Sequence, residues 1–253
     1  MKMQKKIWIT GASSGIGKSL AIKFAENGWK VAISARRVEK LKEVCKINSN
    51  IHSFPLDVLN IDQCDYTFKK ILEKFDNIDK CIFCVGIRDR ESEKNLNLSK
   101  IEKIFKTNFF GNVNTINSVY SYYKNKKEGH ISIIGSIAGY RGLPESGAYS
   151  ASKSALIAFA ESLYFDLSKH NVQLSIINPG FINTDMVKNN KYKMPFIKSS
   201  EYAAHIIYSN IVKNKNFEIH FPKRLSLLMK FLSILPFKLY YKLIKIGSNL
   251  INR

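Results

Sequence analysis

The chain has 253 residues, of which 45% are hydrophobic and 24% charged, and its formal net charge is +20 at pH 7. This length suits a single domain with a sizeable core, and the hydrophobic content is ordinary for a globular protein. The basic residues are spread through predicted helices and loops rather than gathered with aromatics in one motif, which argues against nucleic acid as a partner. No signal peptide precedes the first predicted strand, so we expect a cytoplasmic protein.

Short apolar runs alternate with helical patterns along most of the chain. The runs predict strands near residues 5–10, 30–35, 51–55, 79–85, 130–135, 172–178 and 216–220. Helical periodicity fills most of the gaps, near residues 16–27, 37–46, 61–75, 99–124, 148–169 and 199–213. This alternation predicts a doubly wound (Rossmann) α/β fold, with a parallel sheet, helices on both faces and a ligand at the carboxyl ends of the strands.

The four cysteines are too few and too scattered for a disulfide framework. Cys81 and Cys84 form a C-x-x-C pattern on a predicted strand, where residues three apart face opposite sides and cannot share a metal. We therefore expect reduced thiols and no metal site.

The first predicted strand runs directly into a glycine-rich turn, residues 10–17, and a helical pattern follows it. A strand, a tight glycine turn and a helix N-terminus form an anion site, because backbone N–H groups and the helix dipole point at a phosphate. The missing Cβ atoms let the phosphate approach. The sequence predicts cofactor contacts from Gly11, Ser13, Ser14, Gly15, Ile16 and Gly17; the alternative is a glycine turn without a ligand.

The second predicted strand ends in Ser34-Ala35-Arg36-Arg37, at the position that normally reads the adenosine ribose. An acidic residue there would accept from both ribose hydroxyls and repel a 2′-phosphate. A guanidinium can instead bind that phosphate through paired, charge-assisted hydrogen bonds. We predict NADP rather than NAD, with Arg36 as the phosphate ligand; solvated surface charge is the alternative for both arginines.

Tyr149 and Lys153 stand four residues apart in a predicted helix, so they share one of its faces. There the ammonium would favour the phenolate and lower the phenol pKa from about 10. A phenol tuned in this way can pass a proton to or from a carbonyl oxygen near neutral pH. The pair alone is a weak signal, because random sequence produces it often.

Together these motifs resemble the short-chain dehydrogenase/reductase family in its compact form, over about residues 5–220. The resemblance implies hydride transfer between nicotinamide and a carbonyl or alcohol. Ser136 would polarise the carbonyl, and Tyr149 would supply the proton. Lys153 would tune Tyr149 and hold the nicotinamide ribose, and Asn108 would hold a water that links Lys153 to solvent. These four residues form the implied catalytic set.

The resemblance also implies cofactor contacts outside the glycine turn. Tyr149 and Lys153 belong to this group, and the remaining matches are Asp57 and Val58 at the adenine, Gly86 after the fourth strand, and Pro179, Gly180, Ile182 and Thr184 beside the nicotinamide. The family's Asn-Asn-Ala-Gly reads Phe-Cys-Val-Gly at residues 83–86, which puts an Asn-mediated role there in doubt. Residues 185–196 match the variable substrate region and suit a mobile cover over an apolar substrate.

Residues 223–253 are predicted to be a basic, amphipathic helical extension of an NADP-binding catalytic domain, residues 1–222. An apolar run at 225–235 is closed by Pro236 and is about half the length needed to span a bilayer. On a helix over 237–251, one narrow face carries Lys238, Lys242, Lys245 and Asn249, and the opposite side carries Phe237, Tyr240, Leu243, Ile244, Leu250 and Ile251. Residues 225–253 could lie in the interface of an anionic membrane, cap the substrate pocket or form a subunit contact.

The sequence therefore predicts an NADP-dependent oxidoreductase for a small hydrophobic, lipid-like carbonyl or alcohol. We expect a homo-oligomer, peripheral at the inner face of the membrane if its C-terminal residues bind lipid. The alternative is a catalytically idle cofactor-binding sensor or a membrane-associated scaffold. The intact set Asn108, Ser136, Tyr149 and Lys153 favours the enzyme.

Overall fold

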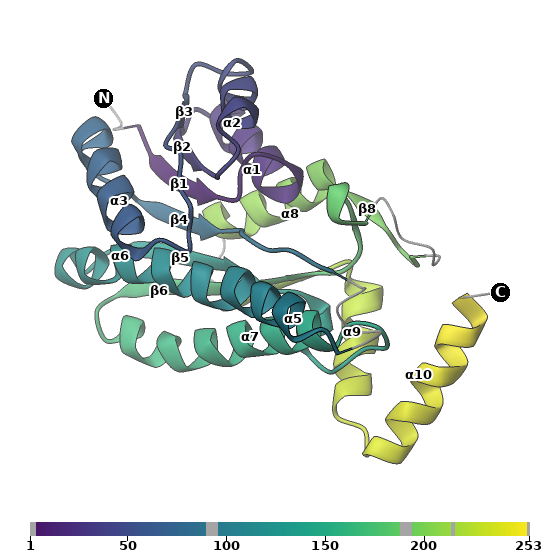
Figure 1. The fold of residues 1–253 in the computed structure, drawn as a ribbon. Helices are drawn as coiled ribbons and strands as arrows, with labels where there is room; N and C mark the ends of the chain where they lie inside the picture. The colour runs from purple at the N-terminus through teal and green to yellow at the C-terminus, as the bar shows by residue number, and fades with distance from the viewer. Residues whose placement is uncertain (1–3, 90–95, 188–193, 214–215, 252–253) are drawn as a thin grey trace.

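The centre of the molecule is a seven-stranded parallel sheet in the order β3-β2-β1-β4-β5-β6-β9 (Figure 1). The computed structural model describes residues 4–89, 96–187, 194–213 and 216–251, without the side chains of residues 248–251. The strands are β1 (Lys6–Thr10), β2 (Lys30–Ser34), β3 (Ile51–Ser53), β4 (Lys80–Phe83), β5 (Gly129–Ile134), β6 (Val172–Pro179) and β9 (Glu218–Phe221). The order confirms the predicted doubly wound fold, and every predicted strand agrees with an observed one to within two residues at each end.

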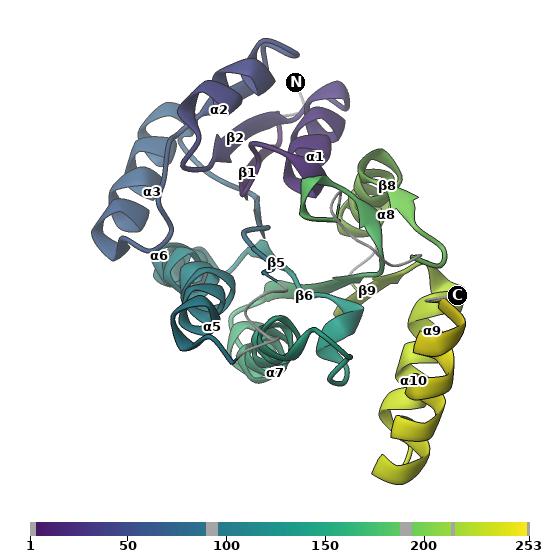
Figure 2. The same ribbon diagram turned by 45° about the vertical axis from the view of Figure 1, so that its right-hand side comes forward.

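Helices cover both faces of the sheet, as Figure 2 shows in a turned view. One face is covered by α1 (Gly15–Glu26), α2 (Val38–Cys45) and α8 (Ser200–Lys213), and the other by α3 (Ile61–Phe75), α6 (Gly111–Lys126) and α7 (Gly147–Ser168). The shorter α5 (Leu98–Phe105) packs beside α7. A second, two-stranded sheet pairs β7 (Ile182–Asn183) with β8 (Lys198–Ser199).

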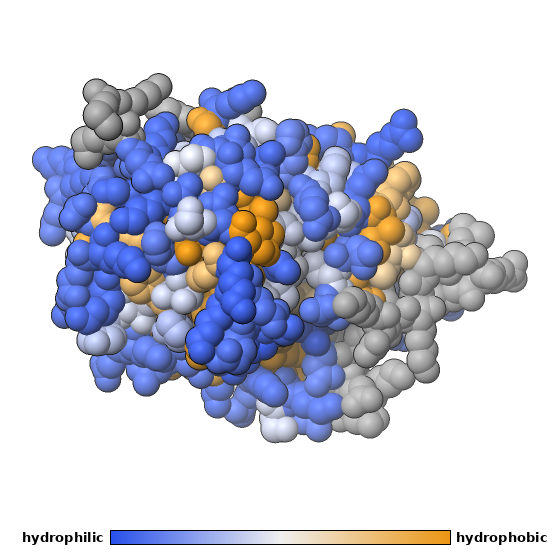
Figure 3. All heavy atoms as spheres, turned by 90° about the horizontal axis from the view of Figure 1, so that it is seen from above, coloured by the Kyte–Doolittle hydropathy of each residue, from blue (hydrophilic) through white to orange (hydrophobic). Residues whose placement is uncertain are grey.

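Two apolar layers, one on each face of the sheet, form the core. In β1, Ile7 and Ile9 pack into one layer and Trp8 into the other, because successive strand residues face opposite sides. A strand that is buried on both faces reads as a continuous apolar run, which is the pattern that predicted β1. Seen from above, the surface is mostly hydrophilic, and hydrophobic side chains show only in small areas (Figure 3).

The helix predicted near residues 99–124 is interrupted by a π-helical turn, Lys106–Phe110, between α5 and α6. The turn carries the buried Asn108. Where it meets α6, a Cβ on Gly111 would lie 2.5 Å from Cγ2 of Val58, so the helix begins where only glycine fits. Local widening of this kind often marks a functional position in a helix.

The four cysteines are free thiols, as predicted. Burial raises the pKa of Cys81 to about 12 and that of Cys84 to about 11, so neither is a thiolate at neutral pH. Within the part of the chain that the structure describes, no three His, Cys, Asp or Glu side chains gather as a metal site would require.

The C-terminal residues form α9 (Lys223–Ser233) and α10 (Phe237–Ile251), which stand at one end of the sheet (Figure 1). We call this helix pair the tail. Leu225, Met229 and Leu232 of α9 and Tyr240 of α10 form a small third core with Ile137. None of the helices in the described ranges is long and apolar enough to cross a membrane. The boundary between a domain of residues 1–222 and an extension stays a prediction.

Arg141 holds the junction between the two tail helices. Its Nη1 donates to the carbonyl oxygens of Leu232, Ser233 and Leu235 at 3.2, 3.1 and 2.6 Å. Its guanidinium lies 4.6 and 4.1 Å from the ring centroids of Phe237 and Tyr240. One arginine thus caps the end of α9 and stacks on the start of α10, which fixes the angle between them.

Candidate active site

In the glycine turn after β1, the backbone packs closely against the backbone of Cys84 and against itself. Gly11 and Gly15 have φ values of +66° and +55°, which side-chain-bearing residues rarely adopt. A Cβ on Gly11 would lie 2.7 Å from the carbonyl oxygen of Cys84, and one on Gly17 would lie 2.6 Å from the carbonyl oxygen of Gly11. The turn therefore needs glycine at these positions, whatever it binds.

The N-terminus of α1 suits an anion. Ser14 is its N-cap residue, but the Ser14 side chain makes no capping hydrogen bond, and the first turn contains no acidic residue. The helix dipole and the first-turn N–H groups are thus not opposed by a local carboxylate. A dinucleotide pyrophosphate fits this cradle.

Arg37, rather than Arg36, contacts the glycine turn. Its Nη2 donates to Oγ of Ser13 and Ser14 at 2.9 and 2.7 Å, and its Nε donates to Oγ of Ser13 at 3.2 Å. Arg36 is exposed and has no hydrogen-bond or ion-pair partner among the described residues. The sequence favoured Arg36 as the residue nearer the end of β2 and gave no sign of the Arg37 contacts with Ser13 and Ser14. The contact of Arg36 with a 2′-phosphate stays a prediction.

Ser136, Tyr149 and Lys153 come together at the carboxyl end of β5. Ser136 follows β5 and precedes a short 3₁₀ turn, Ile137–Gly139, where its Oγ accepts from the N–H of Ala138 at 3.1 Å. Tyr149 and Lys153 lie one turn apart near the start of α7, and Nζ of Lys153 is 5.9 Å from the Tyr149 ring centroid. Tyr149 and Lys153 therefore share one face of α7, as predicted.

The pKa of Tyr149 is raised, not lowered. Desolvation by the surrounding protein raises it, while the hydrogen bond from Ser136 and the charge of Arg88 act in the opposite direction. Lys153 was expected to lower this pKa, and that expectation is wrong for this structure. Nζ of Lys153 is itself buried and donates to the carbonyl oxygen of Ile134 at 2.8 Å, and desolvation lowers its own pKa to about 8.

Arg88 is a site residue that the sequence did not single out. Its guanidinium carbon lies 5.4 Å from the Tyr149 ring centroid, and its Nη2 donates to Oγ of Ser146. It follows Gly86 in a stretch without periodicity, so no pattern pointed to it. The nearest positive charge that favours the phenolate thus comes from the loop after β4.

Asn108 serves a structural role in the described arrangement. Its Oδ1 accepts from the N–H of Ile87 at 2.7 Å, and its Nδ2 donates to the carbonyl oxygen of Ile87 at 2.9 Å and to Oγ of Ser152 at 3.1 Å. These bonds fix the backbone between Gly86 and Arg88 and tie it to α7. The water between Lys153 and solvent stays a prediction.

A polar network behind Ser136 reaches the tail. Asn178 accepts from the N–H of Ser136 at 3.1 Å and donates to Oε1 of Glu218 at 2.9 Å. The Tyr140 hydroxyl donates to the same Oε1 at 2.5 Å, and Lys230 of α9 pairs with the other oxygen. Burial raises the pKa of Glu218, but the hydrogen bonds from Lys230, Tyr140 and Asn178 outweigh burial and lower it.

A cavity of about 790 Å³ joins the glycine turn to Ser136, Tyr149 and Lys153. The predicted site residues that line it are Gly11, Ser14, Gly15, Ile16, Gly17, Gly86, Ser136, Tyr149, Lys153, Pro179, Gly180, Ile182 and Thr184. Ser13, Arg36, Asp57, Val58 and Asn108 do not line it. Most of the predicted site is thus one continuous space.

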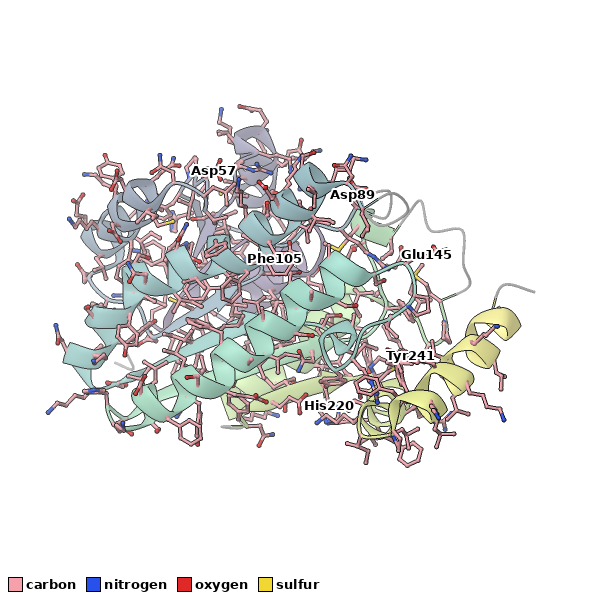
Figure 4. The ribbon with its side chains drawn as sticks, turned by 60° about the horizontal axis from the view of Figure 1, so that its bottom comes forward. Asp57, Asp89, Phe105, Glu145, His220 and Tyr241 are labelled. Atoms are coloured by element: carbon pink, nitrogen blue, oxygen red, sulfur yellow. The ribbon has the colours of Figure 1, made fainter. Side chains whose placement is uncertain are left out.

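Asp57 and Val58 follow β3, outside the cavity that Ser136, Tyr149 and Lys153 line. Figure 4 labels Asp57 well apart from Glu145, which lines the cavity. Oδ1 of Asp57 accepts from the N–H of Leu59 at 3.1 Å, and Val58 is buried against Gly111. Their contact with adenine stays a prediction.

Beyond Ser136 and Tyr149 most of the cavity wall is apolar, although Arg88, Glu145, Ser146 and Asp185 also line it, and much of the apolar part comes from the tail. The tail contributes Leu225, Leu228, Met229, Phe231, Leu232, Leu243 and Ile244. The sequence left three possibilities open for these helices: membrane binding, capping of the pocket and a subunit contact. Their inner side lines the cavity, as a cap would. Met186, Met194 and Pro195 of the predicted substrate region also line the cavity, whereas residues 188–193 lie outside the described residues.

Comparison with known proteins identifies the family. Residues 5–195 match the family model described as short chain dehydrogenase. The chain belongs to this family. The resemblance inferred from the motifs is thereby confirmed, and the protein is a short-chain dehydrogenase/reductase, an NAD(P)-dependent oxidoreductase acting on CH–OH or C=O groups.

Curated relatives and a solved structure agree with this assignment. This chain is 30% identical over 236 residues to an uncharacterized oxidoreductase of Myxococcus xanthus (strain DK1622), and the match covers 92% of this chain and 93% of that relative. It is 34% identical over 194 residues to the dehydrogenase/reductase SDR family protein 7-like of Anopheles gambiae, covering 73% of this chain but only 61% of that relative. The structure of ElxO with NADP bound is similar with a TM-score of 0.80 and 25% identity, covering 88% of this chain and 100% of the ElxO chain.

Proposed function

We propose that this protein is an NADP-dependent oxidoreductase for a hydrophobic, lipid-like carbonyl or alcohol. One observation carries the proposal: Ser136, Tyr149 and Lys153 share a single cavity with the glycine turn at one end and an apolar wall at the other. Apolar pockets with a few convergent polar groups are typical of small-molecule sites.

In this proposal bound nicotinamide supplies or accepts the hydride, and side chains of the protein donate or accept the proton. The Ser136 hydroxyl donates a hydrogen bond to the substrate carbonyl oxygen, and the Tyr149 hydroxyl delivers its proton to that oxygen during reduction. The raised pKa of Tyr149 keeps the phenol protonated, as a general acid requires. Arg88, 5.4 Å from the ring, stabilises the phenolate that remains, while the Ser136 hydroxyl stays bonded to the substrate oxygen.

The residues around the turn support NADP. The glycine cradle and the N-terminus of α1 would hold the pyrophosphate, and Lys153 would hold the nicotinamide ribose. At the end of β2 no carboxylate is present to repel a 2′-phosphate. Arg36 is our proposed phosphate ligand, and Arg37 is held by Ser13 and Ser14 where it adds positive charge.

The test is NADPH oxidation, followed by absorbance, with ketones and aldehydes of increasing apolar length. NADP reduction with the matching alcohols covers the reverse direction. Turnover that rises with apolar length and is lost in Tyr149→Phe supports the proposal. If NADPH binds tightly but no compound is turned over in either direction, the idle-sensor alternative is favoured instead.

A further inference from the structure

The outer side of the tail carries an unusual number of exposed apolar side chains. Leu227 and Phe231 of α9 and Ile234, the residue that ends this helix, are 55%, 56% and 78% exposed. They lie at helical spacings of four and three, so they share one face, opposite the buried Leu225 and Met229. Together with the exposed side chains of α10 described next, we call this surface the tail face.

On α10, apolar and basic side chains are exposed together. Phe237 and Tyr241 are 68% and 61% exposed, and Figure 4 shows Tyr241 on this helix. Lys238 and Lys242 are exposed beside them. Phe and Tyr rings next to lysine stems are typical of helices that lie at a membrane surface, where the ammonium groups reach the headgroups.

The charge of the tail is entirely of one sign. Residues 222–253 contain seven Lys and Arg and no Asp or Glu. Elsewhere, surface lysines pair with neighbouring acids on the same helix, as in Lys40–Glu43 and Lys70–Glu73. Because the tail offers no such partner within itself, its field favours an anionic surface.

The tail face is continuous with the cavity. Leu228, Phe231 and Leu243 line the cavity, and they are 50%, 56% and 39% exposed. They therefore form an apolar mouth between the two helices. Phe231 belongs to both the tail face and the cavity wall, so the tail face borders this mouth.

The tail face is held in a fixed orientation. Arg141 caps the end of α9, and the Tyr240 hydroxyl donates to the carbonyl oxygen of Gly142 at 2.6 Å. The pair of Lys230 with Glu218 fixes the last turn of α9 to the sheet. The folded protein thus presents this surface without having to order a loose segment first.

We propose that the tail face docks on an anionic lipid bilayer, with α9 and α10 lying in the interface and the cavity mouth turned toward the lipid. A lipid-soluble carbonyl compound would then enter the cavity from the bilayer. Docking stands independently of the proposed reaction, and only the delivery of substrate rests on it.

A second copy of the chain is a less favourable occupant. A two-fold contact would place two tails side by side, each basic and without acidic residues. Like charges facing each other across an interface oppose association. A bilayer with anionic headgroups instead matches both the charge and the apolar side chains.

The experiment is co-sedimentation of the full chain with phosphatidylcholine vesicles, with and without phosphatidylglycerol. We expect binding to the anionic vesicles at low salt and its loss near ~1 M salt, where the Debye length falls to about 3 Å. Leu227→Ser with Ile234→Ser, and separately Lys238→Gln with Lys242→Gln, should each weaken binding at least ~10-fold. None of these four side chains lines the cavity.

Matched variants control for composition. Ile47→Ser with Ile61→Ser removes apolar side chains that are 50% and 54% exposed elsewhere, and Lys46→Gln with Lys69→Gln removes the same charge. Both should bind vesicles as the wild type does, and NADPH titration checks that every variant is folded. The docking proposal is refuted if the wild type does not bind anionic vesicles, or if the control variants lose binding equally. It is also refuted if the double variant Leu227→Ser with Ile234→Ser changes from a dimer to a monomer while its vesicle binding stays that of the wild type.

Delivery has its own readout. With a long-chain ketone dissolved in the vesicles, Leu227→Ser with Ile234→Ser should lower turnover, while turnover of a short, water-soluble ketone stays unchanged. Equal turnover of the vesicle-borne ketone by both proteins would refute delivery. Failure of both ketones in the wild type would instead count against the proposed reaction, leaving the vesicle-binding result to decide docking.

Discussion

Keeping Lys153 charged inside the cavity destabilises the fold at neutral pH, and Lys153→Met tests this. Lys153 is 3% exposed, and desolvation lowers its pKa from 10.5 to about 8. Since one pKa unit corresponds to 1.36 kcal/mol, this drop corresponds to about 3 kcal/mol of stability lost when both states are protonated.

The sign follows from proton binding. Between pH 8 and 10.5 the unfolded chain holds a proton on Lys153 more often than the folded chain does. Stability therefore rises with pH in this window, and below pH 8 the penalty is constant. Methionine has no charge to desolvate, so the difference between the two proteins follows chiefly the titration of Lys153 across this window.

The assay is urea unfolding of wild type and Lys153→Met from pH 7 to 10.5. The free energy of unfolding of the variant, relative to wild type, should fall by about 3 kcal/mol across this range. The lost hydrogen bond to the Ile134 carbonyl adds a constant offset and leaves the slope unaffected. Lys69→Met, at an exposed position, should show no such slope. A flat difference for Lys153→Met would refute the reasoning.

Three further substitutions test the site. Tyr149→Phe should lower turnover by at least ~10²-fold with nearly unchanged NADPH affinity, measured by steady-state kinetics and titration, because it removes only the transferable proton; near-normal turnover would remove Tyr149 as the acid. Arg36→Asp should weaken NADPH far more than NADH in fluorescence titrations, whereas equal losses would mean that Arg36 does not read the 2′-phosphate. Gly11→Ala should destabilise the fold by at least ~1 kcal/mol more than Gly28→Ala in urea unfolding. Both glycines have positive φ, but only Gly11 has a backbone atom where the new Cβ would lie, so equal losses would show that the turn can adjust.

The sheet and the glycine turn could be predicted because their signals are local. Ile7-Trp8-Ile9 is buried on both faces, and the glycines at 11 and 17 meet backbone that no side chain could tolerate. Each signal depends on residues close together in sequence, so a single chain is enough to find them. The same holds for Tyr149 and Lys153, which share a face of one helix.

The electrostatics of the site could not be predicted in this way. Whether Lys153 lowers the pKa of Tyr149 depends on how deeply both are buried and on what else lies near. Arg88, from a loop after another strand, supplies the nearest charge, while Lys153 donates to Ile134. Such distances arise only when distant segments pack, so residue types alone gave the wrong direction.

The C-terminal helices could be predicted only in part. Their amphipathic pattern predicted helices correctly, but Tyr240, placed on the apolar side, is 1% exposed whereas Phe237 is 68% exposed. The difference arises because Tyr240 packs in the third core with Leu225 and Met229 and donates to the Gly142 carbonyl, whereas Phe237 does neither. A helical projection cannot distinguish an apolar residue that faces the protein from one that faces outward.

The tail contributes much of the apolar cavity wall but none of the groups proposed to react. The proposed chemistry and much of the apolar lining therefore lie on separate stretches of the chain, joined chiefly through Arg141 and Glu218. An engineer who wants a new substrate range can exchange residues 223–251 as one cassette and keep Ser136, Tyr149 and Lys153 untouched. The cassette must carry partners for Arg141 and Glu218, since a graft without them would take the carbonyl acceptors from the Arg141 guanidinium and the Lys230 ammonium from the Glu218 carboxylate.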